Sequence, residues 1–105
     1  MKKYETEFEV VGTKHYLEIG QGKKIKRGIP LKATLEREPD NPVDGNAIAV
    51  RIDDLKIGHL RRGVAKVLAP EIDKGKLKVN KAKLVEFDPK LGVGTVEVWL
   101  EKRKN

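Results

Sequence analysis

The segment 38–46 gathers side chains that can donate and accept hydrogen bonds on one short stretch of chain. These side chains belong to Asp40, Asn41, Asp44 and Asn46. Two prolines within the segment fix the backbone φ angle, and its Asp, Asn and Gly residues tolerate tight or left-handed conformations. A simple hairpin connection needs only an Asn-Gly or Asp-Gly pair. The additional polar groups therefore predict a rigid loop that serves as a binding site.

Simpler structural roles are also available to these side chains. Asp40 and Asp44 can cap turns through their own backbone, and Asn46 can adopt a left-handed conformation or cap the next strand. A metal-dependent nuclease using Asp40, Asp44 and Asp53 is another alternative, because clustered carboxylates can hold Mg²⁺. No general base or nucleophile accompanies these residues, so we expect no catalytic residue, no metal site and no cofactor.

The residue types present exclude several classes of chemistry. The chain has no cysteine and no serine, which rules out disulfides, thiolate ligands and a serine nucleophile. It has no Gly-Lys-Ser/Thr phosphate loop, so it is not itself an ATPase. The two histidines, His15 and His59, lie far apart in sequence and favour ordinary polar roles over a shared metal site. The sequence thus favours a binding module over an enzyme.

The charge balance points to an anionic partner. Among 105 residues, 23 are Lys or Arg and 16 are Asp or Glu, which gives a net charge of +7. A basic domain of this size often binds a polyanion such as nucleic acid, although a lysine-rich surface can also serve only solubility, as in heat-adapted proteins. No apolar run approaches the ~20 residues that a membrane helix needs, and the N-terminus lacks a signal-peptide pattern. We therefore expect a cytoplasmic protein with no membrane partner.

Alternation of apolar and polar residues predicts the strands that would hold this loop. The expected strands cover residues 7–10, 31–36, 47–52, 56–60, 78–88 and 95–101. Helical spacing predicts a helix over 61–73, in which Pro70 either kinks the helix or starts a second turn and Gly75 ends it. Residues 12–28 are polar and rich in glycine, so we expect a long excursion there with a short strand at most. Trp99 should pack on the outer face against the helix or a loop.

Short strands with few helices usually close into a barrel, because closure removes exposed strand edges. We predict a mainly β fold with one or two short helices, arranged as a small OB-like or SH3-like β-barrel of five or six strands. The chain shows no linker, repeat or low-complexity segment, and its length suits one domain over residues 1–105.

The assembled residues resemble the HIRAN domain. The most specific part is the string Arg-Glu-Pro-Asp-Asn-Pro-Val-Asp-Gly-Asn-Ala-Ile-Ala-Val at 37–50, followed by Ile-Gly-His-Leu at 57–60. The resemblance covers residues 7–75, whereas 76–105 match only in general character as two closing strands. It implies an OB-type barrel with added helices. Such domains occur at the N-termini of Swi2/Snf2-class DNA translocases and as small stand-alone bacterial and phage proteins, which this chain is similar to.

The resemblance also implies a non-catalytic DNA-binding module. In the best-understood members of the family, the domain captures the 3′ end of single-stranded DNA during the remodelling or repair of stalled replication forks. The implied partners are single-stranded DNA or DNA 3′ ends, with a helicase, translocase or nuclease acting in trans. A protein-interaction adaptor is the alternative, in which the barrel docks a partner through an open strand edge or the Tyr16 region.

The family pattern assigns the DNA-end contacts to the loop and to the segment after the first strand. Asp44 would accept a hydrogen bond from a 3′ hydroxyl, since its carboxylate suits a donor and repels a phosphate. Asn41 would donate and accept beside it. Lys14 would pair with a phosphate, while His15 would stack on a base with Tyr16 as the neighbouring aromatic.

The start of the expected helix supplies further contacts in this scheme. His59, Arg61 and Arg62 follow the Ile-Gly turn, where backbone N–H groups and the helix dipole add to the attraction for phosphate. Val43 departs from the family pattern, because many members carry an aromatic residue at this place. Base stacking contributes ~1–3 kcal/mol per base, so the loss of one stacking platform would lower the affinity.

Overall fold

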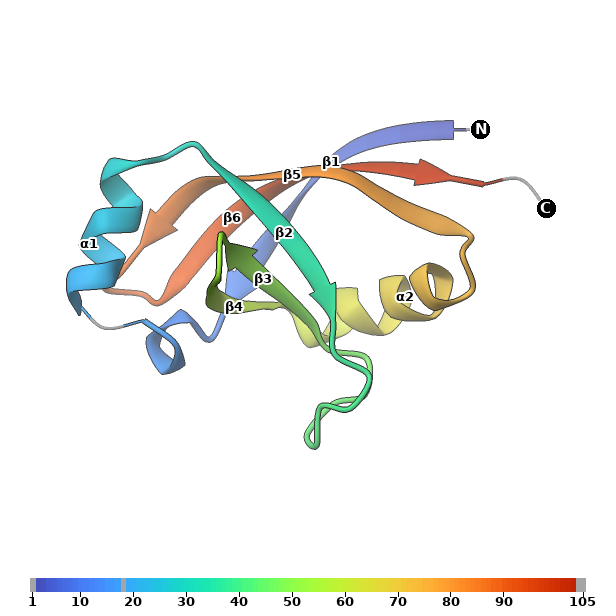
Figure 1. The fold of residues 1–105 in the computed structure, drawn as a ribbon, viewed down its shortest axis with the longest axis horizontal. Helices are drawn as coiled ribbons and strands as arrows, with labels where there is room; N and C mark the ends of the chain where they lie inside the picture. The colour runs from blue at the N-terminus through green and yellow to red at the C-terminus, as the bar shows by residue number, and fades with distance from the viewer. Residues whose placement is uncertain (1, 18, 104–105) are drawn as a thin grey trace.

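Six antiparallel strands form a closed barrel in the computed structural model, which describes residues 2–17 and 19–103 (Figure 1). The strands are β1 (Lys2–Val11), β2 (Leu31–Arg37), β3 (Ile48–Ile52), β4 (Leu55–Leu60), β5 (Leu77–Asp88) and β6 (Val93–Lys102). They follow the order β1-β4-β3-β2-β5-β6 around the barrel, and β6 pairs again with β1. The connections contain two helices, α1 (Ile19–Arg27) and α2 (Arg62–Asp73), and the 3₁₀ turn η1 (Thr13–His15). This architecture confirms the predicted OB-like β-barrel with short helices.

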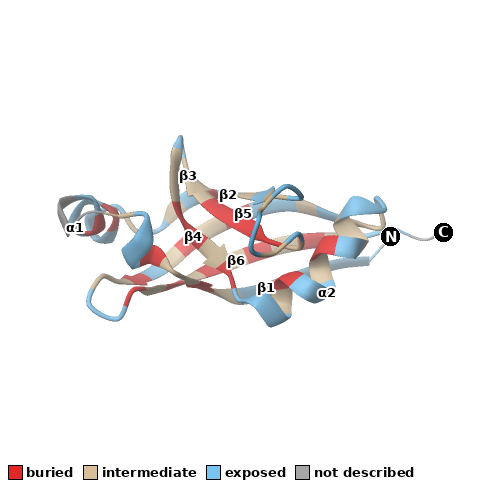
Figure 2. Cartoon of the chain, turned by 90° about the horizontal axis from the view of Figure 1, so that it is seen from below, coloured by how far each residue is buried: buried red, intermediate tan, exposed pale blue. Residues whose placement is uncertain are grey.

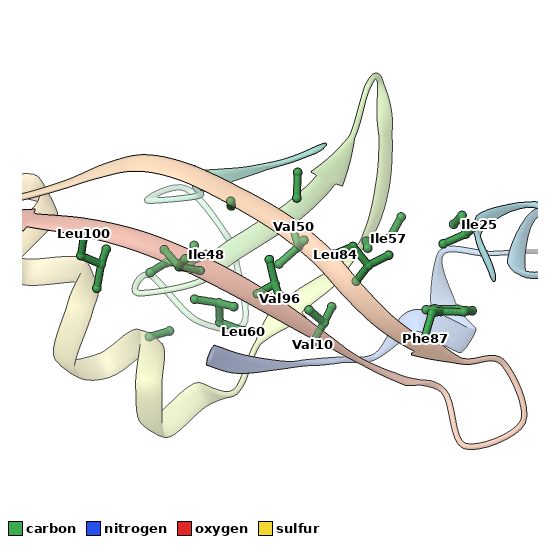
Figure 3. Close-up of a cluster of buried hydrophobic side chains, with 14 of the residues drawn as sticks. Val10, Ile25, Ile48, Val50, Ile57, Leu60, Leu84, Phe87, Val96 and Leu100 are labelled. Atoms are coloured by element: carbon green, nitrogen blue, oxygen red, sulfur yellow. The ribbon is translucent and has the colours of Figure 1, made fainter. Parts of the chain in front are cut away.

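The barrel interior is filled by the alternate residues that the strand pattern predicts. Along β6, Val96, Val98 and Leu100 are buried, while the residues between them are only half-buried. Figure 3 shows Val96 and Leu100 among buried side chains from other strands, which include Val10, Ile48, Val50, Ile57 and Leu84. Burying a side chain of this size contributes roughly 1.5–3 kcal/mol. The buried residues follow the strands through the molecule, and the exposed ones gather at the turns and on the outer faces of the helices (Figure 2).

The segment 12–28 differs from the expected excursion with a short strand. It forms η1 and then the helix α1, which lies at one end of the barrel (Figure 1). Gly22 and Ile25 are both buried there and, three residues apart, share one face of the helix. A Cβ placed on Gly22 would lie 3.5 Å from the ring of Phe87 in β5. Packing against the barrel end therefore stabilises a helix that the composition alone does not favour.

The structure shows how α2 ends and where the side chain of Trp99 lies. Pro70 lies inside α2, which continues past it to Asp73, so no separate turn begins there. Gly75 adopts a positive φ of 73° just beyond the helix, as a C-terminal stop requires. Trp99 is half-buried, between the inward-facing Val98 and Leu100, and the ammonium group of Lys81 lies 5.0 Å from the centre of its ring. Lys81 and Trp99 are register partners in β5 and β6.

The hairpin of β3 and β4 sets up the loop region through an irregular register. Val50 pairs with Gly58 and Arg51 pairs with Lys56, so β4 contains one additional residue between these pairs. Gly58 also passes very close to the end of β1, because a Cβ on it would lie 2.5 Å from the carbonyl oxygen of Val11. Only glycine fits this crossing without a shift of the backbone.

Neither helix, within the part of the chain that the structure describes, combines the length and the apolar character required to cross a membrane.

Candidate functional site

The loop between β2 and β3 is held by hydrogen bonds from its own side chains. Oδ1 of Asn41 accepts the backbone N–H groups of Val43 at 2.9 Å and Asp44 at 3.1 Å. Oδ1 of Asp44 in turn accepts the backbone N–H of Asn46 at 2.9 Å. Both side chains therefore fulfil the structural role of turn caps. This role occupies one oxygen of the Asp44 carboxylate and leaves Oδ2 for a different contact.

Arg37 fastens the base of this loop to α2. Its guanidinium donates to the carbonyl oxygens of Ala47 at 2.8 Å and Gly45 at 3.0 Å. The same group donates two hydrogen bonds of 2.8 Å to the carboxylate of Asp73, the last residue of α2. The hydrogen bond from Arg37 lowers the pKa of Asp73, so this bidentate pair stays ionised at neutral pH. The loop and the end of α2 thus share one anchoring residue.

The carboxylate of Glu38 holds the opposite side of the loop. Its Oε1 accepts a hydrogen bond from Nδ2 of Asn41 at 3.2 Å and lies 2.5 Å from Nε2 of His59. Its Oε2 forms an ion pair with the ammonium group of Lys56. Burial by itself raises the pKa of Glu38, but the hydrogen bonds from Lys56, His59 and Asn41 outweigh it and lower the pKa to about 2. Glu38 is therefore a fixed anion that links β4 to the loop.

The irregular register of β4 explains how two of these partners reach one carboxylate. Lys56 and His59 are three residues apart, and in a regular strand an odd spacing places side chains on opposite faces. The additional residue between the Gly58 and Lys56 pairs reverses this alternation once. Lys56 and His59 consequently point to the same side and both contact Glu38. Simple alternation could not identify either Glu38 or Lys56, which the sequence-based set lacks.

An aromatic side chain extends this cluster towards η1. The ring of Tyr16 lies 5.4 Å from the imidazole of His59, with an interplanar angle of 57°. The ammonium group of Lys56 lies 5.4 Å from the centre of the same ring. Tyr16 remains 38% exposed, so part of its ring is accessible to a ligand. Tyr16, His59 and the loop therefore form one continuous surface.

Arg62 approaches the loop from the first turn of α2. Its Nε lies 3.6 Å from Oδ2 of Asp44, and its Nη2 donates a long hydrogen bond of 3.4 Å to the carbonyl oxygen of Val43. The side chain of Arg62 is 70% exposed, whereas that of Asp44 is 22% exposed. The loop thus presents a half-buried carboxylate oxygen beside an exposed guanidinium that is held by two long contacts.

Three sequence-based candidates, Arg61, Lys14 and His15, are not joined to the loop by any of these contacts. Nε of Arg61 donates a 2.6 Å hydrogen bond to Glu9 in β1, which directs its guanidinium away from Asp44. The stem of Lys14 runs across Gly92 in the β5–β6 turn. His15 is exposed on η1. The structure accordingly brings together five of the eight sequence-based candidates, namely Tyr16, Asn41, Asp44, His59 and Arg62.

The carboxylates considered for a metal-dependent nuclease do not form a common site. Among the described residues, no group of three or more His, Asp or Glu side chains is placed to hold a metal ion. Asp53 lies in the β3–β4 turn with a positive φ of 52°, and it lines a different hollow beside α1. Its turn role agrees with the hairpin expected from the sequence.

The closed antiparallel barrel, with a polar loop held by hydrogen bonds and ion pairs, is an OB-like fold. A family model for the HIRAN domain matches residues 3–101, and the chain therefore belongs to the HIRAN domain family. No curated protein matches the chain.

Three solved structures share the fold. The crystal structure of the HIRAN domain of human HLTF matches with a TM-score of 0.74 and 22% identity, over 94% of this chain and 77% of that one. A protein from Lactobacillus plantarum matches with a TM-score of 0.74 and 23% identity, over 95% of this chain and 99% of that one. The NMR structure of the HLTF HIRAN domain in its DNA-bound conformation gives a TM-score of 0.68 and 22% identity, over 94% and 76%.

Proposed function

We propose that this chain is a non-catalytic DNA-binding module that captures the 3′ end of a single strand at the β2–β3 loop. Membership of the HIRAN family supports this proposal, as does the DNA-bound conformation described for the HLTF HIRAN domain. The net charge of +7 favours a polyanionic ligand. A role in the remodelling or repair of replication forks, with a helicase, translocase or nuclease acting in trans, follows as part of the same proposal. A cytoplasmic location belongs to it as well.

The observation that carries the proposal is the pair formed by Asp44 and Arg62. A 3′-terminal nucleotide presents a hydroxyl donor at one end of its sugar and a phosphate at the other. Oδ2 of Asp44 can accept a hydrogen bond from the hydroxyl, and Arg62, whose side chain is exposed and only 3.6 Å from Asp44, is placed to bind the phosphate. A terminal phosphate in place of the hydroxyl would meet the carboxylate and be repelled.

The neighbouring side chains suit the nucleotides that precede the end. The exposed part of the Tyr16 ring can stack on a base, with His59 and Lys56 supporting it from behind. The candidates that are not joined to the loop would contact nucleotides further along the strand. These are Lys14, His15 and Arg61. The adaptor alternative through an open strand edge has less support, because the described strands pair all the way around the barrel.

Fluorescence anisotropy with matched labelled oligonucleotides tests this proposal. Two single strands of identical sequence, one ending in a 3′ hydroxyl and one in a 3′ phosphate, are titrated at several salt concentrations. We expect the hydroxyl-ended strand to bind at least about tenfold more tightly, a difference of about 1.4 kcal/mol, because the Asp44 carboxylate repels a terminal phosphate. Affinity should fall with salt at a logarithmic slope of about −0.7 for each phosphate neutralised. Equal affinity for both strands would rule out recognition of the end.

A further inference from the structure

A second hollow lies at the end of the barrel that carries α1. It has a volume of about 510 Å³ and is bounded by η1, α1 and the turn between β5 and β6. Figure 1 shows these three segments gathered at that end, away from the β2–β3 loop. The apolar part of its lining comes from Leu17, Phe87 and Pro89, and Lys23 and Lys90 border it. Both lysines are exposed, so their ammonium groups face solvent beside an apolar groove.

Two glycines shape this groove. Gly22 sits inside α1, where glycine is about 0.5–1 kcal/mol less favourable than alanine. A Cβ on Gly22 would lie 3.4 Å from Cβ of Pro89 and 3.5 Å from the Phe87 ring, so a larger side chain would enter the groove. Gly92, with a φ of 71°, lets the stem of Lys14 cross the turn, because a Cβ there would lie 2.8 Å from Cγ of Lys14. Because Gly22 has no side chain, the groove stays open. Because Gly92 has none, the stem of Lys14 can cross the turn and form one wall of the groove.

Positive charge surrounds the groove on the exposed face of α1. Lys23, Lys24, Lys26 and Arg27 follow one another within the nine residues of this helix, and all are exposed. Leu91, in the same β5–β6 turn as Lys90, is 70% exposed. An apolar hollow with an exposed leucine nearby and a basic surround is complementary to a ligand that is both apolar and acidic.

We propose that this groove is a docking site for an acidic peptide segment of a partner protein. One or two apolar side chains of the segment would enter the hollow between Leu17 and Pro89, and flanking Asp or Glu residues would pair with Lys23 and Lys90. The volume suits this, because ligand hollows commonly measure about 300–1,000 Å³. The proposal does not depend on DNA binding, since the Asp44 loop lies elsewhere on the barrel.

A nucleobase fits the same groove less well. The lysines of the lining donate hydrogen bonds but accept none, and Thr13 is only 1% exposed. The N–H donors on the polar edge of a base would therefore find no accessible side-chain acceptor, and unpaired polar groups are costly to bury. Phe87 is only 7% exposed, so its ring face is not available for stacking. Aliphatic or aromatic side chains of a peptide carry no such polar edge. The lining therefore favours a peptide over a single strand.

An array of short synthetic peptides tests the proposal. Each peptide places one or two Leu, Phe or Trp residues among several Asp or Glu residues, and matched peptides replace every acid by Lys. The full chain, labelled with ¹⁵N, is titrated with the acidic peptides that bind. We expect micromolar to sub-millimolar binding, with shifts of the Leu17, Gly22 and Lys90 amide signals. No binding by any acidic peptide, or equal binding by the Lys peptides, would overturn the proposal.

Charge-reversal variants assign the contact to this surface. The double substitution Lys23→Glu and Lys90→Glu should weaken peptide binding at least about tenfold, as expected for the loss of two ion pairs to a bound segment. The control Lys78→Glu and Lys102→Glu makes the same change in net charge at the other end of the barrel and should have a much smaller effect. Equal weakening by both variants would show a non-specific attraction and contradict the proposal.

Two further readouts separate this site from the DNA-end site. Gly22→Leu would fill the groove and should abolish peptide binding, while the milder Gly22→Ala, which favours the helix, should weaken it. The preference for a 3′ hydroxyl over a 3′ phosphate should persist in every one of these variants. If an oligonucleotide, and not the acidic peptides, shifts the Gly22 and Lys90 signals, and Gly22→Leu weakens its binding, the occupant is nucleic acid and the peptide proposal fails.

Discussion

Nε2 of His59 lies 2.5 Å from Oε1 of Glu38, which joins the end of β4 to the start of the β2–β3 loop. Lys56 binds the other oxygen of the same carboxylate, and Asn41 reaches it from within the loop. The loop therefore takes its position from the barrel wall and from Arg37, not only from its own turns. Loss of this carboxylate should affect both the stability of the fold and the position of Asp44.

Glu38→Gln should lower the free energy of unfolding at neutral pH by about 1–3 kcal/mol, because hydrogen bonds to a charged group are replaced by weaker neutral ones. Urea denaturation of both proteins at pH 7 measures the difference. Glu36→Gln is a matched control, since Glu36 lies two residues earlier, is exposed on β2, and forms only a long ion pair of 3.8 Å with Arg51. An equal loss in the control would show that Glu38 is not specially important.

The contribution of Glu38 should also depend on pH in a defined window. Its pKa is lowered from 4.5 to about 2 in the folded protein, so its stabilisation is complete above pH 4.5 and is lost as the pH falls towards 2. The stability difference between the wild type and Glu38→Gln should therefore be constant from neutral pH to about pH 5 and shrink below it. A difference that persists unchanged at pH 2 would contradict this assignment.

Asp44→Ala should remove the preference for a 3′ hydroxyl over a 3′ phosphate, because the discriminating carboxylate is gone. The phosphate-ended strand should bind this variant more tightly than it binds the wild type, which only the loss of a repulsion would produce. Asp40→Ala, a change of equal charge at an exposed position of the same loop, should leave the preference intact. Anisotropy titrations with the two oligonucleotides measure both variants.

Arg62→Ala should weaken both strands and reduce the salt slope by about 0.7, as expected for one phosphate contact. Arg61→Ala should have less effect, because Arg61 is already held by Glu9. Glu9→Gln should release Arg61 and tighten binding. Affinities at several salt concentrations show which arginine contacts a phosphate. A larger change in the salt slope for Arg61→Ala than for Arg62→Ala would assign the phosphate contact to Arg61.

Val43→Trp should tighten single-strand binding by about tenfold if the loop tip meets a base, since stacking contributes ~1–3 kcal/mol per base. Val43 is 79% exposed, so the larger ring needs no repacking of the core. Val67→Trp, at a position on α2 that is 67% exposed, controls for added aromatic surface. An equal gain in affinity in both variants would show non-specific binding by the added ring.

Gly58→Ala should destabilise the fold by about 1–3 kcal/mol, because its Cβ would lie 2.5 Å from the Val11 carbonyl oxygen and the backbone would have to shift. Gly63→Ala is the matched control, since nothing lies within 4 Å of the Cβ it would add in α2. That variant should be as stable as the wild type or more stable by up to about 1 kcal/mol. Thermal or urea unfolding distinguishes the two substitutions.

The strands could be predicted from the sequence because their stability depends on a local pattern. Alternation in β2 and β6 follows directly from burial on one face, so pattern and structure agree. The helix α1 could not be predicted in the same way. Its glycine at position 22 disfavours a helix, and its few apolar residues give only a weak helical pattern. Its stability comes from contact with Phe87, far away in sequence.

The site shows the same division between local and non-local causes. Asn41 and Asp44 stand out in the sequence because a rigid polar loop is a local property. Glu38 and Lys56 were missed because they meet only through the register irregularity of β4, which changes which side chains share a face. The ion pair between Arg61 and Glu9 likewise depends on the pairing of β1 with β4. Such contacts become visible only once the strands are aligned.

The pairing of β1 with β6 has a practical consequence for experiments on this domain. Lys2 in β1 lies opposite Lys102 in β6, so the first and last strands bring the two ends of the chain side by side. Figure 1 shows both ends on the side away from α1. A tether, dye or fused protein attached through either end would therefore project away from the α1 groove. A short bridge between the two ends, with the chain reopened at the exposed Asp53-Asp54 turn, offers a route to a circular permutant.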